Sequence, residues 1–183
     1  MNNIIFFGPP GAGKGTQAKI ISNFLKLPHL STGDILRSKI EQNDKISSKI
    51  KNIIANGKLV SDEILNQIVS EKITNDCDKG FILDGYPRTL DQAIFLNNLL
   101  LSKSYTINSI FNIDINYNTL EKRILKRSLE EQREDDNKNV IKTRYLEYTQ
   151  TTKKVSDFYR QKYEKKFYNI DGTGEIEKIT NKI

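Results

Sequence analysis

Apolar runs alternate with helical patterns along the 183 residues of this chain. Short runs of mostly apolar residues predict buried strands, and apolar residues three and four positions apart predict amphipathic helices. From Ile141 to Tyr159, apolar positions recur in alternating steps of four and three, which predicts one face of a long helix. Strands that alternate with helices favour an α/β fold with a doubly wound parallel sheet of about five strands. The predicted strands are Asn3–Phe7, Pro28–Leu30, Phe81–Leu83, Ile107–Ile113 and Phe167–Ile170.

Residues 32–75 break this alternation. They contain no run typical of a strand, only helical segments separated by polar turns. Gly57 is typical of a helix end, and Ser61, followed by Asp62 and Glu63, is typical of the next helix start. We therefore expect a helical insertion between two strands, and a candidate mobile segment. No repeat or linker divides the chain, so we expect a single domain.

Composition excludes several classes of protein. No apolar run approaches the roughly 20 residues of a membrane-spanning helix, and no basic region precedes the first apolar strand as in a signal peptide. The single cysteine, Cys77, excludes an internal disulfide and a multi-cysteine zinc site. A reducing, cytoplasmic location is therefore expected.

The formal net charge of +6 has three possible meanings. It could mark a nucleic-acid surface, a pocket for a small anionic ligand, or a solvated lysine-rich surface. The lysines are scattered, and the late group Lys162, Lys165 and Lys166 is typical of an exposed helix face. Because no basic stripe with interleaved aromatic residues is present, we favour a solvated surface plus an anion pocket, with no nucleic-acid partner.

A glycine-rich segment, residues 8–16, directly follows the apolar run Ile4–Phe7 and fits G-x-x-x-x-G-K. Glycines allow backbone N–H groups to surround phosphate oxygens. A helix expected over residues 14–25 directs its positive end at the same anion, and Lys14 adds a full charge. A turn that binds nothing is the alternative. The next residue is Gly15 rather than the usual Ser or Thr, whose hydroxyl holds Mg²⁺ in related loops.

A second candidate segment begins where the strand Phe81–Leu83 ends in Asp84. An aspartate at such a strand end is typical of the carboxylate on the Mg²⁺ side of phosphate-loop enzymes. Gly85 and Pro87 then predict a tight turn that projects Arg88 above the sheet. Its guanidinium can bind phosphate through two parallel hydrogen bonds. A turn aspartate and a surface arginine are the alternatives.

Two further polar segments have both structural and binding interpretations. Thr89-x-x-Gln92 is a helix capping box, so Gln92 could serve the helix alone. Thr32 and Asp34 could cap the first helix of the insertion, and Arg37, one turn later, could face solvent. The local sequence leaves these alternatives open.

Arginines recur in the last third of the chain. Arg123 and Arg127 are four residues apart and share a helix face, which suggests an anionic partner because like charges at this spacing repel. Arg133 follows a short polar connection, and Arg144 lies on the next predicted helix. For any one of them, a solvated surface is the alternative.

The segments GPPGAGKGT, STGDILR and DGYPRT and the spaced arginines resemble, in order and spacing, the adenylate kinase family from Met1 to about Gly174. The resemblance implies a cytoplasmic, monomeric phosphotransferase that interconverts ATP and AMP with two ADP, using Mg²⁺. Nucleotides would be its partners, without nucleic acid or membrane. It implies one kinase domain, with a core over 1–30, 76–127 and 135–183, an AMP-binding segment over 31–75 and a lid over 128–134.

Only five residues separate Arg127 from Arg133. This spacing is similar to that of the short-lid form of the family, which implies no zinc site. Closure would then depend more on the arginines themselves than on a covering subdomain.

The resemblance also implies residue roles, with Asp84 orienting Mg²⁺ through water. ATP would be bound by Gly11, Ala12, Gly13, Lys14, Gly15, Thr16, Arg123, Arg127 and Gly174. AMP would be bound by Thr32, Arg37, Lys58, Leu59, Val60, Gly85, Tyr86, Pro87, Arg88, Gln92, Arg133 and Arg144. The catalytic group would comprise Lys14, Arg88, Arg123, Arg127, Arg133 and Arg144.

Two other functions compete with this one. A kinase for UMP and CMP would share the loop and the turn at Arg88, but in those relatives alanine usually stands at the position of Thr32. A nucleotide-driven switch would need Ser or Thr after Lys14 and an N-K-x-D motif, and neither Asn-Lys pair here is followed by that aspartate. The sequence therefore favours AMP as the acceptor.

Overall fold

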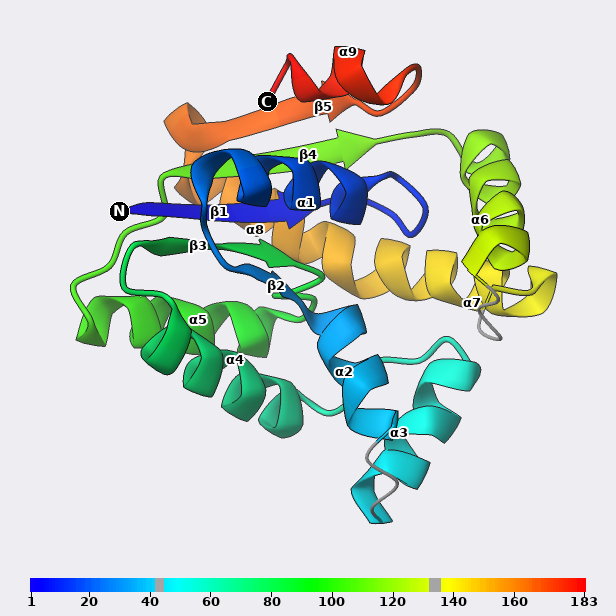
Figure 1. The fold of residues 1–183 in the computed structure, drawn as a ribbon, viewed down its shortest axis with the longest axis horizontal. Coiled ribbons are helices and arrows are strands. Elements are labelled where there is room, and N and C mark those ends of the chain that lie inside the picture. Colours follow the sequence, from blue (N-terminus) through cyan, green and yellow to red (C-terminus); the bar gives the residue numbers. More distant parts are fainter. Residues whose placement is uncertain (42–44, 132–135) are drawn as a thin grey trace.

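The computed structural model describes residues 1–41, 45–131 and 136–183 (Figure 1). Five parallel strands form one sheet in the order β2-β3-β1-β4-β5. Each overlaps a strand predicted from the sequence, so the predicted α/β class and parallel sheet are confirmed. The strands are β1 (Asn2–Phe7), β2 (His29–Ser31), β3 (Gly80–Asp84), β4 (Ser109–Asp114) and β5 (Phe167–Asp171).

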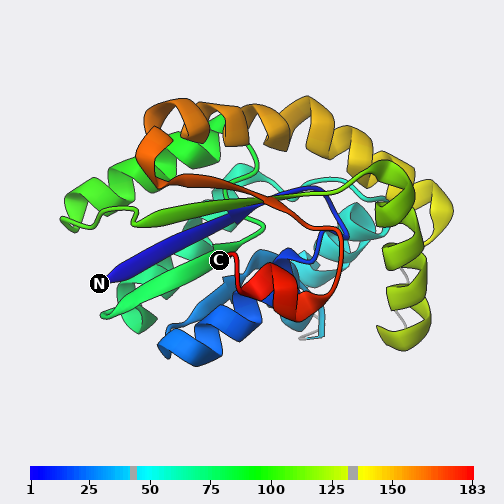
Figure 2. The same ribbon diagram turned by 90° about the horizontal axis from the view of Figure 1, so that it is seen from above.

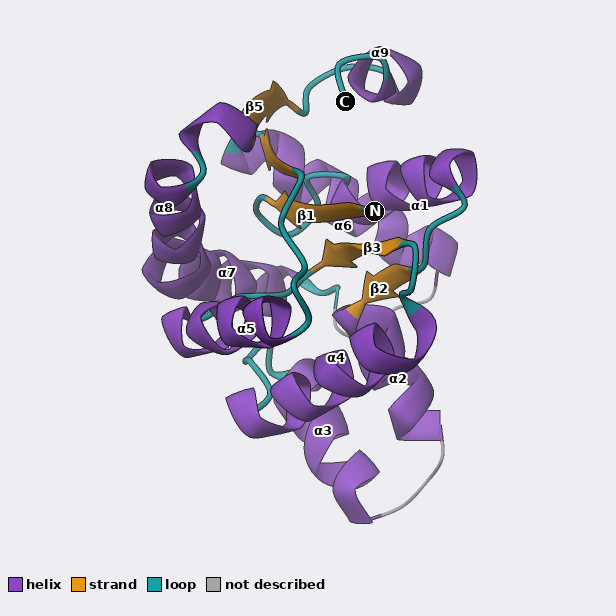
Figure 3. Cartoon of the chain, turned by 90° about the vertical axis from the view of Figure 1, so that its left-hand side faces the viewer, coloured by secondary structure: helices purple, strands orange, loops and turns teal. Residues whose placement is uncertain are grey.

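Helices cover both faces of the sheet (Figures 2 and 3). On one face lie α1 (Lys14–Leu25) and α9 (Ile176–Thr180), and on the other α5 (Leu90–Ser102) and α8 (Lys153–Lys162). The alternation of β1 explains this arrangement, because successive strand residues point to opposite faces. Ile5 and Phe7 join a core with α5 and α8, whereas Ile4 and Phe6 join a second core with α1 and α9.

The insertion between β2 and β3 is helical, as the sequence predicts. It contains α2 (Thr32–Glu41), α3 (Lys45–Ala55) and α4 (Asp62–Asp76), and α2 and α3 extend beyond the β2 edge of the sheet (Figure 1). Gly57 has a φ of 69°, which favours glycine, and a Cβ there would lie 3.1 Å from Val140 Cγ1. The insertion thus approaches the helix that carries Val140.

The long C-terminal helix is not uniform. It consists of α7 (Lys138–Glu147), a π-helical turn (Tyr148–Thr152) and α8. The Thr151 hydroxyl donates to the Glu147 carbonyl at 2.5 Å and so competes with the regular backbone bond at that carbonyl. Before it, α6 (Tyr117–Glu131) follows β4. None of the described helices has both the length and the apolar composition that a membrane span requires.

Candidate active site

The glycine-rich loop lies between β1 and α1, and two of its glycines are required for different reasons. A Cβ on Gly8 would lie 2.2 Å from the Ile113 carbonyl oxygen, so only glycine fits beside β4. Gly13 has a φ of 94°, and a Cβ there would meet no atom within 4 Å. Its requirement is therefore the backbone conformation, and the space beside it is open to a ligand.

Lys14 begins α1, and its Nζ donates to the Pro9 carbonyl at 2.9 Å. Burial lowers the pKa of Lys14 to about 8; Asp84 opposes this shift, and the charges of Arg88 and Arg144 add to it. The lysine is therefore a cation held among other cations. A phosphate anion would relieve this repulsion.

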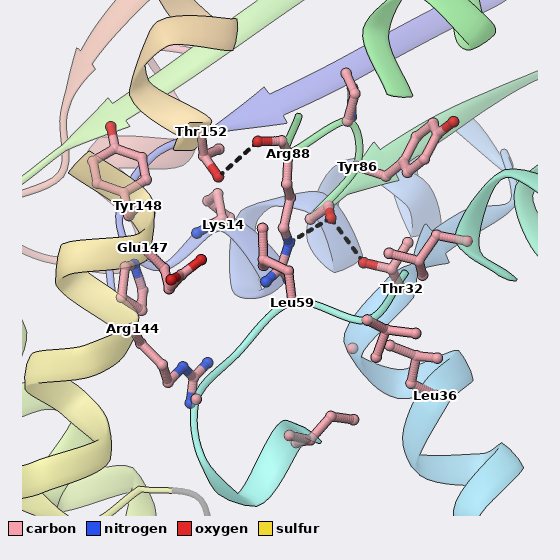
Figure 4. Close-up of a pocket in the computed structure, with 18 of the residues that line it drawn as sticks. Lys14, Thr32, Leu36, Leu59, Tyr86, Arg88, Arg144, Glu147, Tyr148 and Thr152 are labelled. Atoms are coloured by element: carbon pink, nitrogen blue, oxygen red, sulfur yellow. Dashed lines mark hydrogen bonds between the residues drawn. The ribbon is translucent and has the colours of Figure 1, made fainter. Parts of the chain in front are cut away.

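Two cavities meet at this lysine. The larger, about 2790 Å³ including space open to solvent, is lined by residues 10–17, Asp84 and Gly174. The smaller, about 990 Å³ on the same measure, lies between the insertion and the π-helical turn (Figure 4). The residues that line both cavities are Pro10, Lys14, Gly33, Arg37, Gly85, Arg88 and Arg144.

Arg88 is fixed at several atoms. Its Nε donates to the Gly85 carbonyl at 2.7 Å, and its carbonyl accepts from the Thr152 hydroxyl at 3.2 Å. Its guanidinium tip points into the smaller cavity (Figure 4). Burial lowers the pKa of Arg88 to about 10, with Arg144 and Arg37 lowering it further against Asp84. At neutral pH it therefore remains charged.

Thr32 and Arg37 both line the smaller cavity. The buried Thr32 hydroxyl donates to the Gly85 carbonyl at 2.9 Å, so it also braces the turn before Arg88. Arg37 forms a salt bridge with Asp34 one turn earlier. The structure is therefore consistent with both a structural and a binding role for these two residues, because each has a local structural contact and also lines the cavity.

Gln92 lies outside the linings of both cavities and is fully buried. Its backbone N–H donates to the Thr89 hydroxyl at 3.1 Å, as the capping-box interpretation predicts. Its side chain differs from a standard capping box, because Oε1 accepts from the Arg88 N–H at 2.7 Å and Nε2 donates to Asp62 at 2.7 Å. A direct contact of Gln92 with a nucleotide base stays a prediction.

A buried carboxylate organises two arginines. Arg127 donates from Nε and Nη2 to the two oxygens of Asp136, both at 2.7 Å, and Arg144 donates to the same carboxylate at 2.8 Å. The Asp136 side chain has no exposed surface. For Arg127, the anionic partner that the arginine spacing suggested is therefore in part a side chain of the protein itself, Asp136. Arg123 contacts the glycine-rich loop at the Ala12 carbonyl, 3.4 Å away.

Arg133 lies outside the described residues, so its predicted roles remain predictions. All other predicted nucleotide contacts except Gln92 line one cavity or the other. The larger is lined by Gly11, Ala12, Gly13, Lys14, Gly15, Thr16, Arg123, Arg127 and Gly174, and the smaller by Thr32, Arg37, Lys58, Leu59, Val60, Gly85, Tyr86, Pro87, Arg88 and Arg144.

Asp84 ends β3 and lines the larger cavity. Its Oδ2 lies 3.6 Å from His29 Nε2 and would lie 3.2 Å from a Cβ on Gly15. A Ser or Thr after Lys14 would therefore crowd this carboxylate. Within the described ranges, no group of three or more His, Cys, Asp or Glu side chains could hold a metal ion.

Two residues of this region were not identified from the sequence as site residues. Asp136 holds Arg127 and Arg144, and Asp62 holds Gln92. For Asp136, the sequence offers one signal, the pair of aspartates that follows Arg133. For Asp62 it offers none, because an aspartate at the start of a helix is ordinary.

A phosphate-binding loop between the central strand and the first helix, with a half-buried lysine facing several arginines across two joined cavities, defines a phosphate-loop phosphotransferase of the nucleoside monophosphate kinase type. A sequence model of the family "Adenylate kinase" matches residues 6–164. The chain is 41% identical over 187 residues to an adenylate kinase of Brucella anthropi, covering 98% of this chain and 95% of that protein. It is 41% identical over 184 residues to one of Leptospira biflexa serovar Patoc, covering 100% and 98%. The chain belongs to the adenylate kinase family, and nothing in these matches favours the UMP/CMP alternative.

Proposed function

We propose that this chain transfers the terminal phosphoryl group of ATP to AMP, reversibly, giving two ADP. ATP would place its phosphates at residues 11–16 in the larger cavity, and AMP would occupy the smaller cavity. The observation that carries this proposal is the common wall of the two cavities, where Lys14, Arg88 and Arg144 border both. Two phosphate-bearing ligands would therefore meet at one cationic point.

The chain would act by alignment and charge rather than by acid–base chemistry. Phosphoryl transfer passes through a loose transition state, in which charge spreads over the transferred oxygens. The phosphate of AMP is already an adequate nucleophile, so no general base is needed. Lys14, Arg88 and Arg144 would hold the reacting groups in line and stabilise the developing charge.

Mg²⁺ fits the donor set at the end of β3. This ion keeps several of its waters and binds through one or two carboxylates plus substrate phosphates, so a single Asp84 facing the phosphate loop is sufficient. When bound, Mg²⁺ would neutralise charge on the ATP phosphates. Asp84 would orient its waters, and Gly15 leaves room for that carboxylate. We propose no zinc site.

Closure of two segments would complete the site. Residues 31–75 would move with AMP, and the short lid over 128–134 would bring Arg133 to the phosphates beside Arg123 and Arg127. Exclusion of water would limit wasteful hydrolysis of ATP. Asp136 supports this proposal, because it holds Arg127 and Arg144 in one arrangement on either side of the lid.

Several finer points belong to the same proposal. The acceptor would be AMP rather than UMP or CMP, on the basis of Thr32 in the smaller cavity. The enzyme would be a cytoplasmic monomer without a nucleic-acid partner. The single cysteine, Cys77, is free and buried and supports the reducing location.

A coupled assay for ADP tests the function directly. ATP is supplied with AMP, UMP, CMP or no acceptor, and we expect ADP to form rapidly only with AMP. The preference for AMP in kcat/KM should be at least about a hundredfold, which is the combined effect of two contacts to the base of the usual size. Chelation should abolish the activity, added Mg²⁺ should restore it, and elemental analysis should find no stoichiometric zinc. Preference for UMP or CMP, or equal ADP formation without acceptor, would overturn the proposal.

A further inference from the structure

Asp62 joins the helical insertion to the turn that carries Arg88. It is the first residue of α4, where the positive end of the helix favours a carboxylate. One oxygen accepts from Gln92 Nε2 and the other from the Thr89 hydroxyl, both at 2.7 Å. The contact spans the boundary between the insertion and the start of α5. A movement of either segment would therefore shift the other through this contact.

The carboxylate of Asp62 dictates the orientation of the Gln92 amide. A carboxylate can only accept hydrogen bonds, so the NH₂ group of Gln92 must face Asp62. Its carbonyl oxygen then faces the Arg88 backbone N–H, and the observed distance is 2.7 Å. If the amide turned over, its NH₂ group would oppose the Arg88 N–H, donor against donor. Because Gln92 is fully buried, no solvent would replace the lost partner.

A second link runs parallel to the first. The Tyr86 hydroxyl donates to Asn66 at 2.6 Å, and Asn66 lies one turn after Asp62 on the same face of α4. Burial raises the pKa of Tyr86, and the charge of Asp62 raises it further, so the hydroxyl remains a donor. Asn66 of α4 thus holds Tyr86 directly, and Asp62 of the same helix holds Arg88 through Gln92.

We propose that Asp62 is a positioning residue for phosphoryl transfer: it orients the Gln92 amide, which fixes the backbone of Arg88 and thereby aims its guanidinium at the acceptor phosphate. The inference rests on the proposed function, in which Arg88 faces both phosphates. It also makes the position of the insertion and the aim of Arg88 interdependent, because Asp62 belongs to α4.

A charge-exchange pair tests the orientation. Gln92→Glu places two carboxylates face to face at the 2.7 Å contact, and we expect kcat to fall about tenfold or more because Arg88 is displaced. Adding Asp62→Asn reverses the donor and acceptor of that contact. The new Asn donates to the new Glu and accepts from the Thr89 hydroxyl, while the Glu accepts from the Arg88 N–H. We expect the double variant to regain kcat to within about threefold of the original enzyme, the mark of direct coupling.

Asp62→Ala removes both acceptors, and we expect kcat to fall about tenfold and the KM for AMP to rise more than the KM for ATP. Glu63→Gln is the matched control, since it removes a charge from the exposed neighbouring position in the same first turn. It should leave kcat and both KM values within about twofold, as surface changes usually do. All variants are assayed where thermal denaturation shows them folded.

Three outcomes overturn the inference. In the first, Asp62→Ala and Gln92→Glu lower only the melting temperature and leave kcat unchanged, which would mean a purely structural contact. In the second, the double variant is no more active than Gln92→Glu alone. In the third, Glu63→Gln has the same effect as Asp62→Ala. Failure of the proposed function is distinct, because the unmodified enzyme would then form no ADP from ATP and AMP.

Discussion

The phosphate loop (residues 8–16) and the arginine cluster (Arg127, Asp136 and Arg144) both direct positive charge at the cavities, but they are built differently. The loop is one continuous segment whose shape is set by glycine backbone conformations and by close approach to β4. The cluster is assembled from α6, α7 and Asp136, two residues before α7, whose carboxylate has no exposed surface. Loss of the loop's charge should therefore not lower the stability of the fold, whereas loss of the buried carboxylate from the cluster should.

The strongest test of this difference is Asp136→Ala. It leaves Arg127 and Arg144 without the carboxylate that accepts three of their hydrogen bonds. Breaking a buried ion pair costs about 3–5 kcal/mol, and we expect about 3 kcal/mol here, because the two arginine side chains remain 25% and 22% exposed and can be partly rehydrated. Chemical denaturation measures this loss, and kcat should fall with it.

The control is Asp157→Ala, which removes an aspartate from a surface pair with Arg160, where both side chains are about half exposed. An exposed pair contributes about 0–1 kcal/mol, so stability and kcat should hardly change. Equal losses in Asp136→Ala and Asp157→Ala would show that the cluster does not depend on its buried carboxylate.

Lys14→Met tests the loop side of the comparison. Because the loop is held by its backbone and its surroundings disfavour the charged form of Lys14, the melting temperature near neutral pH should not fall and should rise. Loss of a fixed charge at the transferred phosphate should cost about 3 kcal/mol or more, above a hundredfold in kcat. Lys154→Met, at an exposed position of α8, serves as the control. A folded Lys14→Met enzyme that keeps more than about a tenth of the original rate would remove the lysine from catalysis.

The same difference decides what could be predicted from the sequence. The helix over residues 14–25 and the chemistry of the loop are written in adjacent residues, so both were predictable. The contacts of Asp136 and Asp62 join residues that packing brings together, and no local pattern specifies such partners. Gln92 shows the limit: its capping-box pattern gave the Thr89 contact, but its side chain reaches Asp62, thirty residues away.

Neither region can select a base, because both face phosphate, which every nucleotide carries. Thr32→Ala should therefore alter acceptor selectivity, which neither charged region sets, and it also removes the bond to the Gly85 carbonyl. We expect the preference for AMP over CMP and UMP to narrow by about 1–3 kcal/mol, the size of a single small contact, mainly through a higher KM for AMP. Values of kcat/KM for the three acceptors measure this. Unchanged ratios would remove Thr32 from the base site and leave only its bond to Gly85.

Gln92→Ala separates a capping role from a role in the AMP site. A residue that only caps α5 would lower stability by about 1 kcal/mol and leave acceptor selectivity alone. We expect instead a lower kcat and higher KM values for all three acceptors, because the Arg88 N–H loses its acceptor and Arg88 faces the phosphate that they share. A preference for AMP that also narrows would indicate the predicted contact of Gln92 with the base. The same three acceptors and a denaturation curve give both quantities.

The last distinction between the two regions is by pH. The pKa of Lys14 is about 8 in the folded protein, against 10.5 for an unperturbed lysine, whereas Arg88 keeps its charge until about pH 10. Above pH 8 the free enzyme loses the lysine charge that binds phosphate. We therefore expect kcat/KM for ATP to fall by up to about tenfold per pH unit between pH 8 and 9.5, with no such fall in Lys14→Met.

The stability of the nucleotide-free protein should move in the opposite direction. Between pH 8 and 10.5 the unfolded chain holds a proton on Lys14 that the folded protein has released. Stability rises with pH wherever the unfolded state binds more protons, so Lys14 should contribute increasing stability across this window, and Lys14→Met should lack that contribution. Denaturation curves at pH 7.5, 8.5 and 9.5, compared between the two proteins, measure the difference. If kcat/KM for ATP and stability both fell with rising pH in the original enzyme but not in Lys14→Met, the folded surroundings would favour the charged form of Lys14. The contrast between a destabilised loop charge and a paired arginine cluster would then be wrong.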